Sequence, residues 1–395
     1  MVGTCDAGPL KFLWSFSLKA GLSLVIGSFF SVQLFAQQST NEVSFSAREE
    51  NVWSETKLEG QESTRDTDFR ISGGGKALHK TEWSTALLSE GVSIEHNRSL
   101  KKDGHATDVG ATIFGQKDFS LQSHMLTLYA NYGRYSGQTS QPFTLWLSSK
   151  SEETTYRRVG VILLDTFTLS KAIQFYLRTS AARFSSAQVS ILYGIAAGFI
   201  IGHTERLTST IEGMAERQIV VDSNEKTDIT GGAYTLAYDA TPNTKISGKV
   251  GRNFLFRKAT HDTVDLFGAY LVHKDKVDED SLAVEKTLGT KETTDVLIES
   301  NSIQAAKKRE IDDQRQLEIR CGYRQEKTVF SESNRTEHLM LGYVAYRHFF
   351  GTRVKSVAKG YSTSITGDYR FESGFVEKSS SQRHTLGIGI NHALL

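Results

Sequence analysis

The chain has 395 residues, a formal net charge of +1 at pH 7, a hydrophobic content of 38% and a mean hydropathy of −0.33. The balanced charge argues against a dedicated nucleic-acid binder, and the low hydropathy excludes a bundle of membrane helices. Only 3 prolines accompany 33 glycines, which suits long strands because proline interrupts a sheet ladder. Two cysteines, Cys5 and Cys321, are too few for a disulfide-stapled secreted domain once a leader containing Cys5 is removed.

Residues 1–36 have the pattern of a secretory signal peptide. An early stretch with two lysines leads into an apolar run from Ala20 to Ala36, and the small Ala36 fits the position before a cleavage site. A polar segment begins at Gln37, without the positive cluster that would stop the transfer of a membrane anchor. We therefore predict export with cleavage near Ala36. An uncleaved membrane anchor is the alternative.

Residues 37–80 differ in composition from the rest of the chain. They are rich in Ser, Thr, Glu and Arg, and a run of three glycines, Gly73–Gly75, lies near their end. A segment of this composition buries little apolar surface. We predict a polar, mostly disordered periplasmic tail, with one short strand near Ile71.

From Trp83 onward the sequence becomes a series of alternating segments. Apolar residues occupy every second position in 126–132, 143–147, 173–177, 317–323, 365–371 and 386–390. This period predicts strands with one apolar and one polar face. Some connections are short, such as Thr241–Thr244, and others are longer, such as Ser148–Thr155. Tight turns at one end and longer loops at the other are typical of an outer-membrane barrel.

The segment Val189–Gly202 carries bulky apolar residues at odd positions, mostly small residues at even positions and no charge. It exceeds the roughly 9–11 residues of a transmembrane β-strand, and a buried helix or a central strand of a soluble sandwich are the alternatives. The residues predicted to face lipid are Val189, Ile191, Ile195, Phe199 and Ile201, and those predicted to face inward are Gly194, Ala196 and Gly198.

The stretch YDATPNTKISGKVG at residues 238–251 consists of an aromatic-polar strand, a short Thr-Pro-Asn turn and a second alternating strand. This arrangement resembles the porin-like outer-membrane β-barrel proteins of Gram-negative bacteria. The resemblance covers residues 83–395 as a repeating pattern and carries no functional residue. It implies location in the outer membrane, with outer-membrane lipid and the barrel-insertion machinery as partners. Family members commonly finish with an aromatic residue, whereas this chain ends in Leu395.

We predict an all-β, antiparallel transmembrane barrel over residues 81–395, with about 14 strands in a range of about 12–16, because a closed barrel satisfies every backbone group in lipid. The heavily charged segment 275–315 does not follow the strand pattern. We expect a long extracellular loop there with some strand at its edges. A helix over Ser302–Gln316, a strand pair over Leu282–Ser300 and a lumen plug are alternatives.

No constellation for catalysis, cofactor binding or metal binding stands out in the sequence. Gly-x-Ser-x-Gly and His-Glu-x-x-His motifs are absent, and the 11 histidines are scattered without cysteine or carboxylate partners at ligand spacing. The sequence therefore predicts a protein that is not an enzyme and has no cofactor.

Ten charged residues occupy polar-face positions of the predicted strands. A lysine or arginine facing lipid near the midplane costs roughly 2–4 kcal/mol, so a wet interior is the expected location. These candidate lumen-lining residues are Arg178, Glu212, Glu216, Lys245, Lys249, Glu318, Arg320, Arg324, Asp368 and Arg370. They favour a passive channel for small polar solutes. Both signs occur among them, so the sequence supports no prediction of ion selectivity. The alternatives are a structural or adhesive surface barrel that displays its loops and an outer-membrane lipid-modifying enzyme.

Overall fold

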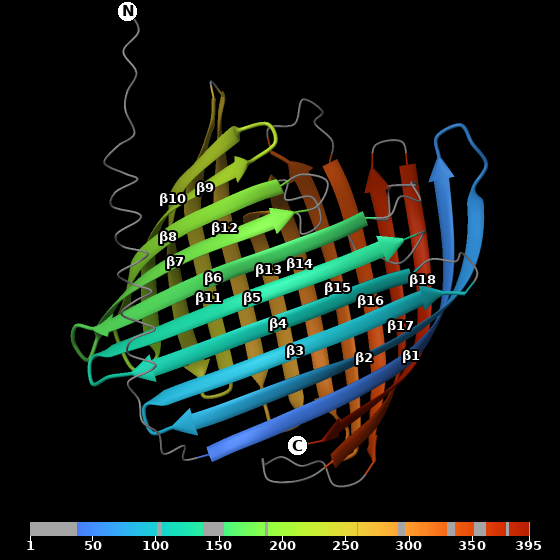
Figure 1. Ribbon diagram of the computed structural model, residues 1–395, viewed down its shortest axis with the longest axis horizontal. Helices are drawn as coiled ribbons and strands as arrows, with labels where there is room; N and C mark the ends of the chain where they lie inside the picture. The colour runs from blue at the N-terminus through green and yellow to red at the C-terminus, as the bar shows by residue number, and fades with distance from the viewer. Residues whose placement is uncertain are drawn as a thin grey trace, which may run out of the picture.

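The chain forms a closed antiparallel β-barrel in the computed structural model (Figure 1). The structure describes residues 38–100, 105–136, 154–185, 189–258, 260–290, 297–329, 336–350, 361–376 and 379–394. Within these residues eighteen strands pair with their neighbours in chain order, and β1 closes the barrel by pairing with both β2 and β18. The predicted all-β antiparallel barrel is confirmed.

The strands in chain order are β1 (Gln38–Leu58), β2 (Thr64–Trp83), β3 (Ala86–Ser99), β4 (His105–Asp118), β5 (Gln122–Ser136), β6 (Thr154–Thr168), β7 (Ile173–Ser185), β8 (Val189–Gly202), β9 (Leu207–Val220), β10 (Glu225–Thr241), β11 (Thr244–Arg257), β12 (Thr260–Lys274), β13 (Asp278–Thr290), β14 (Leu297–Glu310), β15 (Arg315–Thr328), β16 (Thr336–Phe350), β17 (Tyr361–Val376) and β18 (Ser379–Leu394). Figure 1 shows β2–β8 crossing one wall and β11–β17 forming the wall behind it. No helix among the described residues is long and apolar enough to cross a membrane.

Strand β8 coincides with the predicted segment and shows how the sequence specifies two faces. Ile195 and Phe199 are 44% and 43% exposed, whereas Ala196 is 3% exposed and its glycine neighbours on the same face are buried. Successive side chains on a strand point to opposite sides, so the bulky residues form one surface and the small residues the other. We call the surface with Ile195 the outer face and that with Ala196 the inner face.

The outer face carries large apolar side chains around the whole barrel. Residues that pair across neighbouring strands point to the same side of the sheet. The two faces assigned on β8 can therefore be followed from strand to strand. Exposed outer-face residues include Val92, Ile113, Ile211, Val250, Phe267, Ile303, Ile319, Val344 and Ile388. Charged residues such as Glu49 and Arg217 also lie on this face, but exposed apolar side chains recur on strand after strand, as a bilayer requires of a barrel wall.

The two ends of the barrel are defined by the termini. Val43 near the start of β1 pairs with Leu394 at the end of β18, and we call this end the terminal rim. The opposite end, where β1 connects to β2, is the loop rim. The described turns at the terminal rim include Thr241–Thr244, where the sequence predicted one between β10 and β11.

Three sequence predictions are wrong. The barrel has 18 strands rather than about 14. Residues 38–58 and 64–80, predicted as part of a mostly disordered tail, belong to β1 and β2, because each strand finds hydrogen-bonding partners on both sides in the closed sheet. The segment 275–315, predicted as a loop, supplies β13 and β14 to the wall, where oppositely charged side chains such as Lys307 and Asp280 are paired across the two strands.

Several predicted features lie outside the described residues. These are the signal peptide at 1–36, the alternating segment 143–147, most of the connection Ser148–Thr155 and the terminal Leu395.

Candidate functional site

All ten candidate residues lie on the inner face. Arg178 is on β7, Glu212 and Glu216 are on β9, and the pairings Arg178–Ala196, Glu212–Gly198 and Glu216–Gly194 put them on the small-residue side of β8. The two lysines are on β11, three residues are on β15 and two are on β17, each alternating with exposed apolar neighbours. This set consists of Lys245, Lys249, Glu318, Arg320, Arg324, Asp368 and Arg370.

The inner face is concave, as side-chain contacts across β8 demonstrate. The Tyr176 hydroxyl on β7 donates a hydrogen bond of 2.6 Å to Glu212 on β9. Gly198 lies between them, and a Cβ there would come within 2.8 Å of the Tyr176 hydroxyl oxygen. Long side chains from alternate strands meet only on the concave side of a barrel. The small even residues of β8 therefore provide the space in which this tyrosine and glutamate meet.

The same arrangement recurs where the barrel closes. Arg48 on β1 reaches across β18 to Asp368 on β17, with a distance of 2.7 Å between guanidinium Nη2 and carboxylate Oδ1. Arg48 Nε also donates to Glu50 at 2.7 Å. Gly387 of β18 lies beneath, and a Cβ at that position would overlap the Arg48 guanidinium. Glycine at position 387 thus permits an ion bridge between strands that are not adjacent.

This arc of the inner wall holds a dense set of charges, which we call the ion cluster. It contains Arg48, Glu50, Asp68, Arg70, Asp368, Arg370, Glu372 and Arg383, from β1, β2, β17 and β18. Four are cationic and four anionic. Arg70 donates to Asp68 at 2.7 Å and Ser99 donates to the other oxygen of Asp68 at 2.6 Å. The side chains of Asp68 and Arg70 are 3% and 7% exposed. Both Asp68 oxygens therefore have a donor, which reduces the desolvation cost of burying this carboxylate.

A tyrosine joins the ion cluster to β15. Tyr343 on β16 pairs with Arg320 on one side and Arg370 on the other. The two guanidinium carbons lie 5.7 Å and 5.9 Å from the Tyr343 ring centroid, within cation–π range. Arg320 also pairs with Glu318 on its own strand. The structure therefore brings four of the ten predicted residues, Glu318, Arg320, Asp368 and Arg370, into one continuous network.

The remaining predicted residues stand apart from that network. Arg324 pairs with Glu326 at 3.2 Å further along the inner face of β15. Lys245 and Lys249 form no ion pair among the described residues. They are the charges most available to a mobile ion or solute.

Sequence reasoning missed Arg48, Glu50, Asp68, Arg70 and the closing role of their strands. A signal was present, since Ser44, Ser46, Arg48 and Glu50 alternate with Val43, Phe45 and Ala47. The outer face of β1 then continues with Glu49 and Asn51, which hides the alternation.

Next to the ion cluster the inner wall is hollowed. The hollow has a volume of about 560 Å³ and extends over β1–β5, β17 and β18. Hydroxyl and amide side chains line it together with charges of both signs, among them Ser46, Ser72, Asn131, Lys76 and Glu95. It contains the donors and acceptors that replace hydration water around a polar solute.

The described residues contain no group of three histidine, cysteine or carboxylate side chains that could hold a metal ion. The contacts on the inner face are ion pairs, hydrogen bonds and cation–π contacts. This surface offers charged groups of both signs together with hydrogen-bond donors and acceptors.

Solved structures that resemble the chain in overall course share little sequence with it. OccAB4 of Acinetobacter baumannii is 11% identical over 90% of this chain and 99% of that one, with a TM-score of 0.47. OpdQ of Pseudomonas aeruginosa is 8% identical over 89% and 97%, with a TM-score of 0.46. The FrpB iron transporter of Neisseria meningitidis is 6% identical over 91% and 82%, with a TM-score of 0.49.

No family model matches the sequence, and no curated protein matches it.

Proposed function

We propose that the protein is a porin-like channel of the outer membrane, through which small polar solutes pass passively. The observation that carries the proposal is the contrast between the two faces of one closed wall. The outer face carries many exposed apolar side chains and fewer charges, whereas the inner face carries the ten charged candidates, the ion cluster and the polar hollow. Charges of this number are tolerated in a membrane only where water or protein surrounds them.

The barrel size supports an aqueous lumen. Barrels of about 8 strands have interiors filled by side chains, whereas those of about 16–18 strands leave room for a water channel. The segment 275–315 forms wall strands rather than a plug, and every described connection at the rims is a turn of a few residues. The proposed role of Lys249, Arg320 and the other inner charges is to set the electric field that a permeating solute meets.

The test is electrical recording of the purified, assembled protein in planar bilayers, together with swelling of vesicles in sugar solutions. We expect stepwise ion conductance and swelling in a small neutral sugar. Heat-modifiable migration on a gel verifies assembly beforehand. Assembled protein that conducts no ions would contradict the channel proposal and favour a barrel that displays its loops.

We also propose export by the segment 1–36, with cleavage near Ala36. The support is the apolar run and its small final residue. N-terminal sequencing of protein from outer membranes should begin within a few residues of Gln37, and an intact Met1 would contradict the proposal.

A further inference from the structure

The wall is incomplete between β12 and β13. Their ladder contains eight pairs, from Phe267–Lys286 to Lys274–Glu279, at the terminal-rim end. By comparison, β11 and β12 form fourteen pairs and β13 and β14 form thirteen. Toward the loop rim, and among the described residues, 263–266 of β12 are paired with β11 alone, and 287–290 of β13, which the same register would place opposite them, are paired with β14 alone. We call this interruption the seam.

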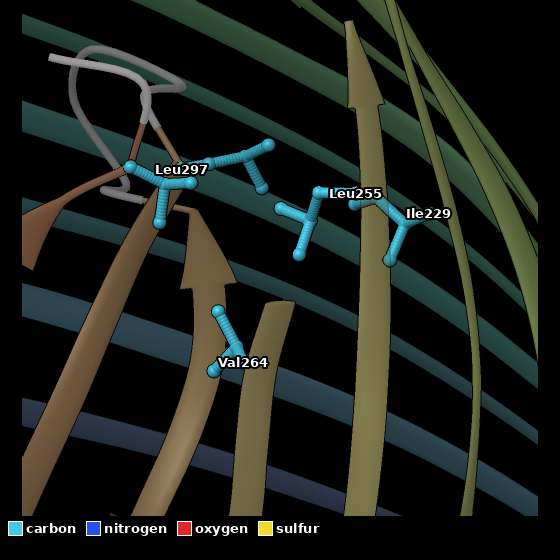
Figure 2. Packing of buried hydrophobic residues seen from close by; sticks show 5 residues of the cluster. Ile229, Leu255, Val264 and Leu297 are labelled. Carbon is cyan, nitrogen blue, oxygen red and sulfur yellow. The ribbon is translucent and has the colours of Figure 1, made fainter. Parts of the chain in front are cut away.

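An apolar cluster occupies the seam where the ladder ends (Figure 2). Ile229, Leu255 and Val264 contribute from the inner face of β10, β11 and β12 and are 0–2% exposed. Leu297 at the start of β14 and Val329 just after β15 complete it, and both are 7% exposed. Met214, Leu266 and Leu288 pack against these five residues.

The two halves of the apolar cluster come from opposite faces of the sheet. Leu297 and Leu288 share the alternation of the exposed Ile303 and Leu282, so they belong to the outer face of their strands. They nevertheless pack on inner-face residues of β10–β12. The tips of β13 and β14 therefore pass inside the wall formed by β10–β12, and the outer surface of one lies against the inner surface of the other.

Two ion pairs lie beside the seam, one between β11 and β12 and one between β13 and β14, and neither of them crosses from β12 to β13. Arg252 of β11 donates to Asp265 of β12 at 2.6 Å, and Lys286 of β13 pairs with Glu299 of β14 at 2.6 Å. The contacts that hold the overlap shut are those of the apolar cluster. A hydrocarbon chain is as apolar as leucine, so exchanging leucine contacts for acyl-chain contacts costs little, whereas opening a complete ladder in lipid leaves backbone groups unpaired.

We propose that the seam is a lateral portal, through which the hydrocarbon chain of a membrane amphiphile reaches the inner side of the wall. The apolar cluster is the surface that the chain contacts. On the outer face the ladder ends at Phe267, which is 43% exposed and pairs with Lys286 of β13. This activity goes beyond passage of polar solutes along the lumen, because it connects the barrel interior with the bilayer.

The test is fluorescence quenching by lipids whose acyl chains carry bromine, with the native tryptophans replaced by phenylalanine. A single tryptophan is placed at the half-buried, inner-face Leu266 by Leu266→Trp. Leu271→Trp on the outer face of the same strand is the lipid-exposed reference. Leu192→Trp, half-buried on the inner face of β8, is the shielded reference. We expect quenching at position 266 to lie clearly above that at 192 and below that at 271.

A second substitution loosens the overlap. Leu297→Ser should increase quenching of the tryptophan at 266, whereas Leu339→Ser, at a buried leucine of the fully paired β16, should leave it unchanged. If Leu297→Ser does not assemble, the quenching of the tryptophan at position 266 relative to that at position 192 still tests the portal. Quenching at 266 no greater than at 192, in assembled protein, would overturn the portal, whatever the bilayer recordings show.

Discussion

The two walls of the barrel interior differ in how they are held together. Around β1, β2, β17 and β18 the ladders are complete, with sixteen pairs between β1 and β18, and the inner face carries the ion cluster. Around β10–β14 one ladder is halved, and the inner face carries the apolar cluster. The inner-face ion pairs lie on strands that are hydrogen-bonded to each other along their full ladders. The apolar packing lies where part of a ladder is missing.

This difference has a physical basis. Ion pairs are directional and need a rigid backbone to keep their geometry, as for the Asp68 oxygens held by Arg70 and Ser99. Apolar contacts are non-directional, so they need no such fixed geometry. The first wall is therefore suited to holding charges in a fixed arrangement.

The largest effect is expected in the ion cluster. Asp68→Ala removes the partner of a 7%-exposed Arg70 side chain and should destabilise the barrel by about 3–5 kcal/mol, the usual penalty for leaving a buried charge unpaired. Urea unfolding of the assembled protein, followed by gel mobility, measures it. Asp312→Ala is the matched control, since Asp312 also pairs with an arginine but in an exposed turn. Equal losses of unfolding free energy for Asp68→Ala and Asp312→Ala would contradict a larger contribution from the buried ion pair.

The apolar cluster should respond nearly as strongly. Leu255 is fully buried, so Leu255→Ala should cost about 2–5 kcal/mol through lost contacts and the cavity left behind. Leu236→Ala, on the outer face of β10 and 39% exposed, is the control and should lose clearly less. If urea unfolding shows the same loss of unfolding free energy for Leu255→Ala and Leu236→Ala, the apolar cluster does not hold the seam closed.

The outer face can be tested at the middle of β8. Ile195→Arg should cost roughly 2–4 kcal/mol if position 195 lies near the bilayer midplane. Leu169→Arg, in the turn between β6 and β7 and 60% exposed, should be tolerated. Equal stability of the two variants in lipid vesicles would show that Ile195 does not face lipid.

The sequence predicted the barrel but not its size or its network of contacts. Strand β8 was predicted with its correct ends because no charge interrupts its outer face. Strands β1 and β13 were missed because outer-face polar residues, Glu49 in β1 and Lys286 in β13, break the alternation. The segments predicted as a mostly disordered tail and as a long loop supply β1, β2, β13 and β14, and they contribute to the difference between about 14 predicted and 18 observed strands.

The contacts of the candidate site depend on register between strands far apart in the chain. Arg48 and Asp368 are 320 positions apart and meet only because the barrel closes between β1 and β18. At the seam, Leu255 of β11 and Leu297 of β14 likewise come together in the apolar cluster although they are not on adjacent strands. Alternation indicates which face a residue occupies, but it does not indicate which residue on another strand it will contact.

The most direct test of a conducting, charge-lined lumen is the reversal potential of single channels in a salt gradient. Arg320 is on the inner face, with a side chain 57% exposed, and Arg217 is on the outer face, with a side chain 54% exposed. If inner charges set the field in the lumen, Arg320→Glu should shift the reversal potential toward cation preference, and Arg217→Glu should leave it at the wild-type value. An unchanged reversal potential for Arg320→Glu, or equal shifts for both variants, would contradict a field set by the inner face.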